Sequence, residues 1–184
     1  MVVARAGLVV SLLLLTAAAV PAQEMPNLPT PGPEHAVFRM DEGTWDAVVE
    51  LQGPPGAPPM QSKGVEVNTV GCNGLCLITE FTGDVGGMPF AGHGIATWDP
   101  AKKKYVSSWS DSMSTGLSLS EAEWEEPGRR MVGYMEATDP QSGQTVRMKS
   151  VVEYRDGGRV MTMYMPGPDG KDVQSMRIAY TKRK

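Results

Sequence analysis

From Gly43 to the C-terminus, the chain alternates between short runs that favour β-strands and small groups of residues that favour tight turns. The run GTWDAVVEL at residues 43–51 shows the strand pattern, because every second residue from Trp45 to Leu51 is apolar and acidic residues stand among those between them. This period of two is typical of a strand with one buried face. The pattern therefore predicts an all-β fold.

Turn signals such as Asn73-Gly74 and Asp139-Pro140 divide this region into about ten predicted strands. No stretch after Gly43 has a sustained helical period, and the loops are short. The economical topology is therefore an up-and-down antiparallel sheet closed into a barrel, which leaves no exposed edge strands. A two-sheet sandwich is the competing architecture. After the first strand, the others are expected near residues 61–70, 75–83, 88–98, 103–110, 116–124, 130–138, 144–154, 159–165 and 172–182.

Residues 1–22 have the pattern of a cleavable secretory signal peptide. Arg5 forms a short basic region and an uncharged, largely apolar run follows it. The expected cleavage site lies between Ala22 and Gln23, with a cut after Ala19 as the alternative. The apolar run is short for a bilayer core of about 30 Å, and no later stretch is apolar enough to span one. We therefore expect a periplasmic or secreted protein.

The segment between the signal peptide and the barrel is predicted to be a flexible leader followed by a short helix. Residues 23–34 contain four prolines and one glycine, a composition that favours an extended leader. Residues 35–42 are long enough for about two helical turns that cap one end of the barrel. Val37, Phe38 and Met40 can then face inward.

Residues 35–184 are expected to form a single domain. Loss of residues 1–22 removes one cation, Arg5, so the formal charge changes from −4 to −5. A mildly acidic chain, with no basic run longer than the three residues at 102–104 and at 182–184, argues against nucleic acid or anionic lipid as the main partner. The oligomeric state is left open by the sequence.

Several segments resemble a bacterial family catalogued as domain of unknown function 1579, which is grouped with the lipocalin-like, or calycin, barrels. They are GTWDAVVEL, GPPGAPPMQSKG, GMPFAGHGIATWDPAKKKYVSSWSDSMSTG and GPDGKDVQSMRIAYTKRK, within residues 35–184. The resemblance implies a lipocalin-like barrel in which Trp45, two residues after Gly43, plugs one end. It implies no catalytic residues, because the family has no established activity. The chain departs from the family at residues 71–76, where relatives usually have a Gly-Gly turn.

The two cysteines of the chain, Cys72 and Cys76, stand on either side of the turn Asn73-Gly74-Leu75. If this is a three-residue hairpin loop with glycine in the left-handed conformation, the two thiols face each other at bridging distance. An oxidising compartment then favours a disulfide that fixes the register of the hairpin. A redox pair or half of a metal site is the alternative, although no histidine is close in the sequence.

A wall of aromatic residues is predicted on two adjacent strands. Alternation places Trp98 on a face with small residues, including Gly92 and Gly94, which would leave room inside the barrel. In the next strand Tyr105, Trp109 and Asp111 share one face. The four larger side chains, Trp98, Tyr105, Trp109 and Asp111, are therefore candidates for a ligand pocket. The alternative is that the tryptophans are core residues and Asp111 caps the following turn.

No catalytic or metal-binding motif is present in the sequence, so we predict neither a metal nor a cofactor. His93 is the histidine within a predicted strand, and acid–base chemistry would involve it first, with Glu80 or Asp111 as further candidates. Alternation places both His93 and Glu80 on the outer face, unless a β-bulge reverses the register.

Methionine is frequent, with thirteen in the chain, and Met161, Met163 and Met165 share one strand face. These thioethers could bind Cu(I), line a cavity for varied apolar ligands, or fill gaps in a core. We expect a protein that binds a small apolar or amphipathic molecule inside the barrel. The alternatives are a barrel enzyme acting on a lipid-like substrate and a structural envelope protein whose barrel is filled by its own side chains.

Overall fold

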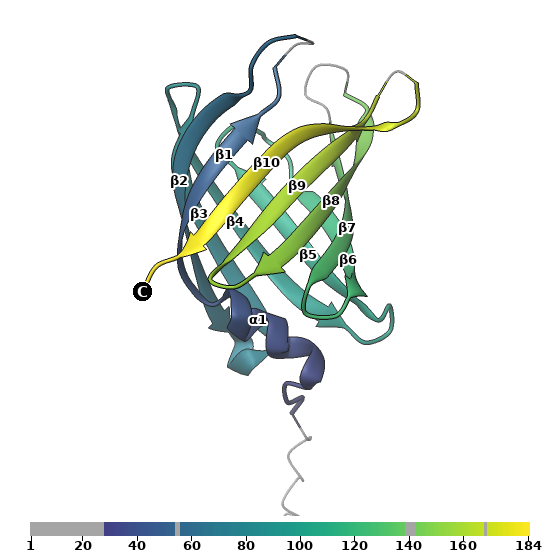
Figure 1. Cartoon of the computed structure of the whole chain (residues 1–184). Helices are drawn as coiled ribbons and strands as arrows, with labels where there is room; N and C mark the ends of the chain where they lie inside the picture. Colours follow the sequence, from purple (N-terminus) through teal and green to yellow (C-terminus); the bar gives the residue numbers. More distant parts are fainter. Residues whose placement is uncertain (1–27, 54–55, 139–142, 168) are drawn as a thin grey trace, which may run out of the picture.

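The structure, a computed structural model, describes residues 28–53, 56–138, 143–167 and 169–184. Ten antiparallel strands form a closed barrel in which each strand pairs with its neighbours in the sequence, and β1 pairs with β10 (Figure 1). The prediction of an up-and-down barrel is thus confirmed, and the sandwich is excluded. The strands are β1 (Gly43–Leu51), β2 (Met60–Gly71), β3 (Cys76–Val85), β4 (Met88–Asp99), β5 (Lys104–Asp111), β6 (Ser118–Glu126), β7 (Arg130–Thr138), β8 (Thr145–Arg155), β9 (Gly158–Pro166) and β10 (Asp172–Lys182).

The barrel is closed by a long, regular pairing between its first and last strands. In this pairing Trp45 lies opposite Lys182 and Leu51 lies opposite Met176. The register shifts at a β-bulge between β9 and β10 and at another between β6 and β7. Bulges of this kind increase the local twist and bend that a closed sheet requires.

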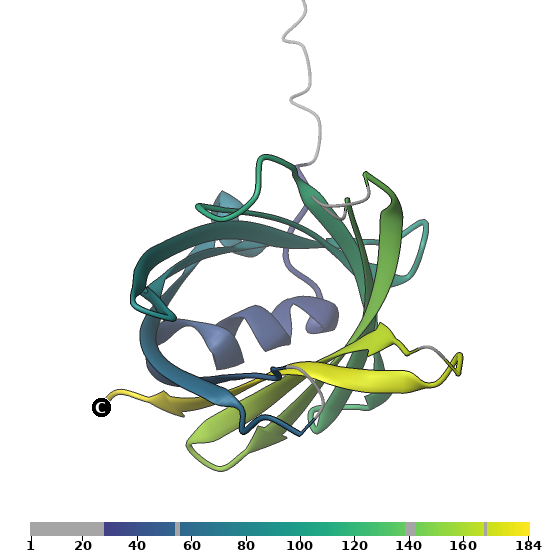
Figure 2. The ribbon, with the colours of Figure 1, turned by 90° about the horizontal axis from the view of Figure 1, so that it is seen from above.

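One end of the barrel is covered by a short helical segment, as predicted. A 3-10 turn, η1 (Pro33–His35), leads into α1 (Ala36–Asp41), and Figure 2 shows α1 lying across the ring of strands. Val37 and Phe38 are buried against the barrel, in agreement with the prediction. Met40 was expected to face inward as well, but it is 42 % exposed, because a helical rotation of about 100° per residue places Asp41 rather than Met40 on the face of Val37 and Phe38.

Two ends of the barrel can be distinguished by following the strands from α1. Because β1 begins next to α1 and all neighbours are antiparallel, the odd-numbered strands start at the α1 end and the even-numbered strands finish there. The opposite end, which no described helix covers and which we call the open end, carries the connections between β1 and β2, β3 and β4, β5 and β6, β7 and β8, and β9 and β10. The predicted signal peptide and the first part of the predicted leader lie outside the described residues. Among those that are described, no helix is long and apolar enough to cross a membrane.

Two clusters of buried apolar residues form the core of the barrel. One cluster lies under α1, where Val37 and Phe38 pack on Leu77 and Tyr105. The other lies along the seam between the first and last strands. Its buried members are Trp45, Ala47, Val49, Phe81, Ile178 and Tyr180. The packed core is therefore concentrated at the α1 end and on the β10–β1–β3 side.

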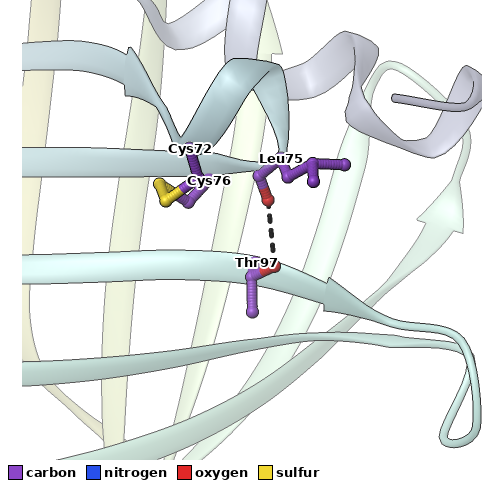
Figure 3. The surroundings of a disulfide bond; sticks show 4 residues. All are labelled: Cys72, Leu75, Cys76 and Thr97. Carbon is purple, nitrogen blue, oxygen red and sulfur yellow. Dashed lines mark hydrogen bonds between the residues drawn. A yellow bond between two sulfur atoms is a disulfide. The ribbon is translucent and has the colours of Figure 1, made fainter. Parts of the chain in front are cut away.

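The predicted disulfide between Cys72 and Cys76 is present (Figure 3), with a Cα–Cα distance of 5.4 Å. It closes the short 3-10 turn η2 (Cys72–Gly74), in which all three residues have positive φ. The Thr97 hydroxyl on β4 donates a 2.9 Å hydrogen bond to the Leu75 carbonyl and ties the turn to the next strand. The disulfide thus fixes the strained turn between β2 and β3, and the hydrogen bond from Thr97 fixes its position relative to β4.

Candidate functional site

The barrel interior is not uniformly packed. Along each strand, the inward-facing residues are those with the same parity as the members of the two apolar clusters. On β4 to β9 most of these residues are partly exposed, including Phe90, Trp109, Met148, Ser150 and Met163. Inward-facing side chains that remain partly accessible border space that solvent can reach, within the barrel or at its end opposite α1. This accessible inner surface is the candidate site.

One side of this surface is formed by methionine. The registers of β7 to β10 place all seven methionines that follow Met113 on the inward face. No methionine is among the buried residues of the described core. The predicted alignment of three methionines on β9 is thus part of a larger arrangement, which we call the methionine wall. It consists of Met131, Met135, Met148, Met161, Met163, Met165 and Met176.

The opposite side is formed by aromatic residues that lie over glycines. The Trp109 ring covers Gly92 and Gly94, since a Cβ added to Gly94 would lie only 3.0 Å from Trp109 Cε3 and one added to Gly92 would overlap the ring. Phe81 covers Gly64 in the same way. We predicted that the small residues on β4 would leave empty space, but the Trp109 ring fills it. These small residues allow a large ring to lie flat against the wall.

Asp111 lies at the open end of β5, on the same face as Trp109. Its Oδ2 accepts a 3.0 Å hydrogen bond from Trp109 Nε1, and its Oδ1 accepts a 2.9 Å bond from the Met113 backbone N–H. The carboxylate therefore does what both sequence interpretations described. It stands beside the aromatic wall, and it also caps the turn that follows the strand.

Trp98 and Tyr105 lie at the other end of the interior, beneath α1. The Tyr105 hydroxyl donates a 2.8 Å hydrogen bond to the Glu34 carbonyl and accepts one of 3.1 Å from Trp124 Nε1. Trp98 packs edge-on against Tyr105, with 5.0 Å between ring centroids. Burial raises the pKa of Tyr105, so its hydroxyl remains protonated. The four predicted pocket residues are thus divided, with Trp98 and Tyr105 at the floor and Trp109 and Asp111 near the mouth.

A buried charged cluster at the α1 end was not predicted. Arg159 on β9 is 6 % exposed, and its guanidinium lies between the rings of Trp45 and Tyr180, at 4.2 and 4.4 Å from their centroids. It forms an ion pair with the buried Glu66 on β2 and lies 3.1 Å from Asp41 Oδ1 on α1. The ring of Trp45, the predicted plug, therefore packs on the guanidinium of this ion cluster. Its Nε1 donates a 2.8 Å hydrogen bond to the Asp41 carbonyl.

Neutral hydrogen-bond donors complete this cluster. Asn68 Nδ2 donates to Glu66 Oε1 at 2.7 Å and to the Asp41 carbonyl at 3.1 Å, while the Tyr154 hydroxyl donates to Asp41 Oδ2 at 3.1 Å. Burial raises the pKa of Asp41, and the nearby Glu66 acts in the same direction, against the attraction of Arg159. Two carboxylates therefore share one guanidinium at the floor of the barrel.

No local signal in the sequence identifies these residues, because β2 reverses the usual alternation. In the middle of β2 the apolar residues Val65 and Val67 face outward, whereas Glu66 and Asn68 face inward and are buried. The registers explain the reversal, since Glu66 lies opposite both Trp45 and Phe81. Val67 is left 39 % exposed on the outer face.

His93 and Glu80 lie outside the barrel, on the face that alternation predicted. Their side chains are 70 % and 62 % exposed, with His93 Nδ1 4.0 Å from Glu80 Oε1. Ser110 lies opposite His93 on the next strand. These groups do not converge with Asp111, which faces inward. His35 is buried against Phe38 and accepts a 3.0 Å bond from the Gly32 N–H. The described residues contain no cluster of metal-ligating side chains.

A groove of about 410 Å³ on the outer wall is bordered mainly by outward-facing residues of β5 to β8 and of the turn before β5. Glu121 in this groove pairs with Lys102 at 2.6 Å and with Lys104 at 3.4 Å. The Arg147 guanidinium lies 4.2 Å from the centroid of the Tyr134 ring. Because these charged groups already have partners, the groove is a weaker candidate than the interior.

Comparison with known proteins supplies a family but no activity. No curated protein matches the chain. Residues 30–182 match the family described as "Protein of unknown function (DUF1579)", and this range includes α1 and all ten strands. The chain therefore belongs to this family of proteins of unknown function, DUF1579.

Proposed function

We propose that this protein binds a small apolar or amphipathic molecule inside its barrel. The observation that supports the proposal is the partly exposed inner surface of β4 to β9, which is lined by methionine and aromatic side chains. Removing apolar surface from water contributes about 25 cal/mol per Å². The hydrophobic effect alone would therefore favour binding of an apolar guest that covers this surface.

The open end is the expected entry, because α1 and the buried cluster of Arg159 obstruct the other end. Trp109 and the methionine wall would cover the apolar body of the guest, with Trp98 and Tyr105 at the floor. Polar groups of the interior could orient a polar end. Among them are Asp111, the paired Ser107 and Ser120 hydroxyls 2.5 Å apart, and Ser62, whose Oγ is buried without a hydrogen-bond partner in the described part of the chain.

The test is a binding titration with N-phenyl-1-naphthylamine, a neutral dye whose fluorescence rises in apolar surroundings. We expect saturable binding that weakens at least about fivefold in Trp109→Ala, because the ring supplies a large contact surface. The matched control is Leu119→Ala on the outer face of β6, where Leu119 is 60 % exposed, and it should bind as the wild type does. A dye that does not bind, or that binds equally to both variants, would contradict binding in the interior.

The accessible inner surface also weighs against the filled structural barrel. A barrel stabilised by its own side chains would bury its inward-facing residues on every strand, whereas here β4 to β9 leave most of theirs partly exposed. The enzyme hypothesis gains no support from His93 and Glu80, because both are on the outer wall.

We further propose that residues 1–22 are removed on export and that the protein works in the periplasm or outside the cell. The Cys72–Cys76 disulfide supports an oxidising compartment. The intact mass of the protein recovered from the periplasm should correspond to a chain that begins at Gln23. It should be lower by two hydrogens than the mass of the dithiol form. Recovery of the uncleaved chain from the cytoplasm would contradict the proposal.

A further inference from the structure

We infer that the interior selects an uncharged, planar aromatic or conjugated molecule over a saturated chain and over an anion. This inference rests on the proposed function and specifies the chemical class of the guest. Three observations carry it: the placement of methionine, the position of the aromatic wall, and the partners of the inward-facing charges.

Methionine lines the partly exposed inner surface and borders the packed seam, where Met161 and Met176 pack against the buried residues. The buried seam is made by Val49 and Ile178 with aromatic side chains, and none of the methionines in the described chain is buried. Each methionine of the wall therefore keeps part of its surface accessible, including those that pack against the seam. A flexible, polarisable thioether on an exposed inner surface is suited to contact a guest, and sulfur binds the edges of aromatic rings better than aliphatic carbon does.

Phe90 and Trp109, the aromatic residues near the mouth, face the methionine wall across the barrel. In a closed ring of ten strands, the strand five places away lies diametrically opposite. Phe90 on β4 is thus opposite β9, and Trp109 on β5 is opposite β10. A flat guest between them could stack on the rings with one face and meet Met163 and Met176 with its edge or other face.

Among the residues that the structure describes, no inward-facing cation is available to pair with an anionic guest. Among the described inward-facing residues, the cations are Arg159 and Lys182. Arg159 is buried between Glu66 and Asp41, and Lys182 lies at the α1 end, where its Nζ donates a 3.3 Å bond to the Met40 carbonyl. The charge nearest the mouth is the carboxylate of Asp111. Burial of a carboxylate or phosphate would therefore go uncompensated, which disfavours fatty acids.

The experiment compares three guests of similar size by isothermal titration calorimetry of the full protein. Naphthylmethanol and undecanol have the same number of carbons and one hydroxyl each, and undecanoate replaces the hydroxyl end with an anion. We expect naphthylmethanol to bind about tenfold more tightly than undecanol, because stacking and sulfur contacts add to burial. Undecanoate should be the weakest of the three.

Variants then test whether sulfur is responsible. Met163→Leu and Met176→Leu conserve volume and apolarity, so each should weaken naphthylmethanol about two- to fivefold and leave undecanol unchanged. Met113→Leu, at a residue that is 52 % exposed outside the strands, is the control and should change neither. Equal affinities for naphthylmethanol and undecanol, or tight binding of undecanoate, would overturn the inference while supporting the proposed function. If none of the three binds, the proposed function itself fails.

Discussion

At the scale of single residues, Arg159 makes the most demanding set of contacts. It is the cation for two buried carboxylates, and it also lies between two aromatic rings. Removal of one member of a buried ion cluster leaves the opposite charges buried without a partner, which strongly lowers the free energy of unfolding. Replacement of the whole cluster by apolar residues would cost much less. The stability of the α1 end should therefore depend on this one side chain.

We predict that Arg159→Met lowers the free energy of unfolding by about 3–5 kcal/mol at neutral pH, as measured by urea denaturation. The matched control is Arg177→Met on β10. Arg177 is partly exposed and forms a 3.4 Å ion pair with Glu50 on the neighbouring strand, so its loss should cost about 1 kcal/mol or less. Similar losses in the two variants would show that the buried cluster has no special role. In a Glu66→Gln background the cost of Arg159→Met should become smaller, because fewer charges are left unpaired.

At the scale of elements, the turn between β2 and β3 shows how a sequence motif fixes a local structure. Cys72, Asn73 and Gly74 all have positive φ, a conformation that costs about 1–2 kcal/mol for a residue other than glycine. The disulfide across the turn and the hydrogen bond from Thr97 hold the chain in this conformation. A ring this small constrains the unfolded chain only modestly, by about 2 kcal/mol in the loop-entropy account.

We predict that the double variant Cys72→Ser/Cys76→Ser keeps the barrel and loses about 1–2 kcal/mol of stability. Reductant should destabilise the wild-type protein by the same amount and leave the variant unaffected, in urea unfolding followed by circular dichroism. Loss of β-structure in the variant would mean that the disulfide is required for folding. A variant as stable as the oxidised protein would mean that the turn is held by its other contacts alone.

The elements also show what could be predicted from the sequence and what could not. Strand positions and closure follow from alternation and turn residues, which act locally, and the faces of β4 and β5 were predicted correctly for the same reason. The face of β2 could not be predicted from its own residues. Glu66 is buried because Trp45 and Phe81 lie opposite it and Arg159 reaches it from β9. Contacts between residues this far apart in the sequence leave no local pattern.

At the scale of the whole molecule, the barrel separates two kinds of interior. The α1 end is packed and charged, and α1 is fastened there through Asp41, whose carbonyl and carboxylate contact Trp45, Asn68, Tyr154 and Arg159. Toward the other end the described inward-facing side chains are mostly apolar and partly exposed, with the Asp111 carboxylate beside them. The aromatic residues predicted as one pocket wall lie on both sides of this division, which sequence spacing alone could not reveal. Proton binding at Asp41 should therefore affect stability without changing the part of the proposed binding surface formed by Trp109 and the methionine wall.

This separation predicts a pH dependence with a definite sign. The pKa of Asp41 is raised above its usual value near 3.8 because burial disfavours the charged form. The folded state therefore binds a proton that the unfolded state has released. Stability contributed by this carboxyl is fully present below about pH 4 and is lost as the pH rises through the folded pKa, with a slope of at most about 1.4 kcal/mol per pH unit. Relative to wild type, Asp41→Asn should thus gain stability as the pH rises above about 4, in urea titrations from acid to neutral pH.

Asp46 provides a control of opposite sign on the outer wall. Its pKa is lowered by hydrogen bonds from Arg183, at 3.0 Å from Nε and 2.6 Å from a terminal nitrogen. Its contribution is therefore present above about pH 4 and lost as the pH falls through the lowered pKa, so Asp46→Asn should lose stability relative to wild type as the pH rises toward 4. Naphthylmethanol binding should stay constant in both variants across this range, because neither carboxyl lies on the proposed binding surface. If Asp41→Asn follows the wild-type pH profile, Asp41 is not the group that couples protonation to the closed end. If its affinity for naphthylmethanol changes with pH, the two ends of the barrel are not independent.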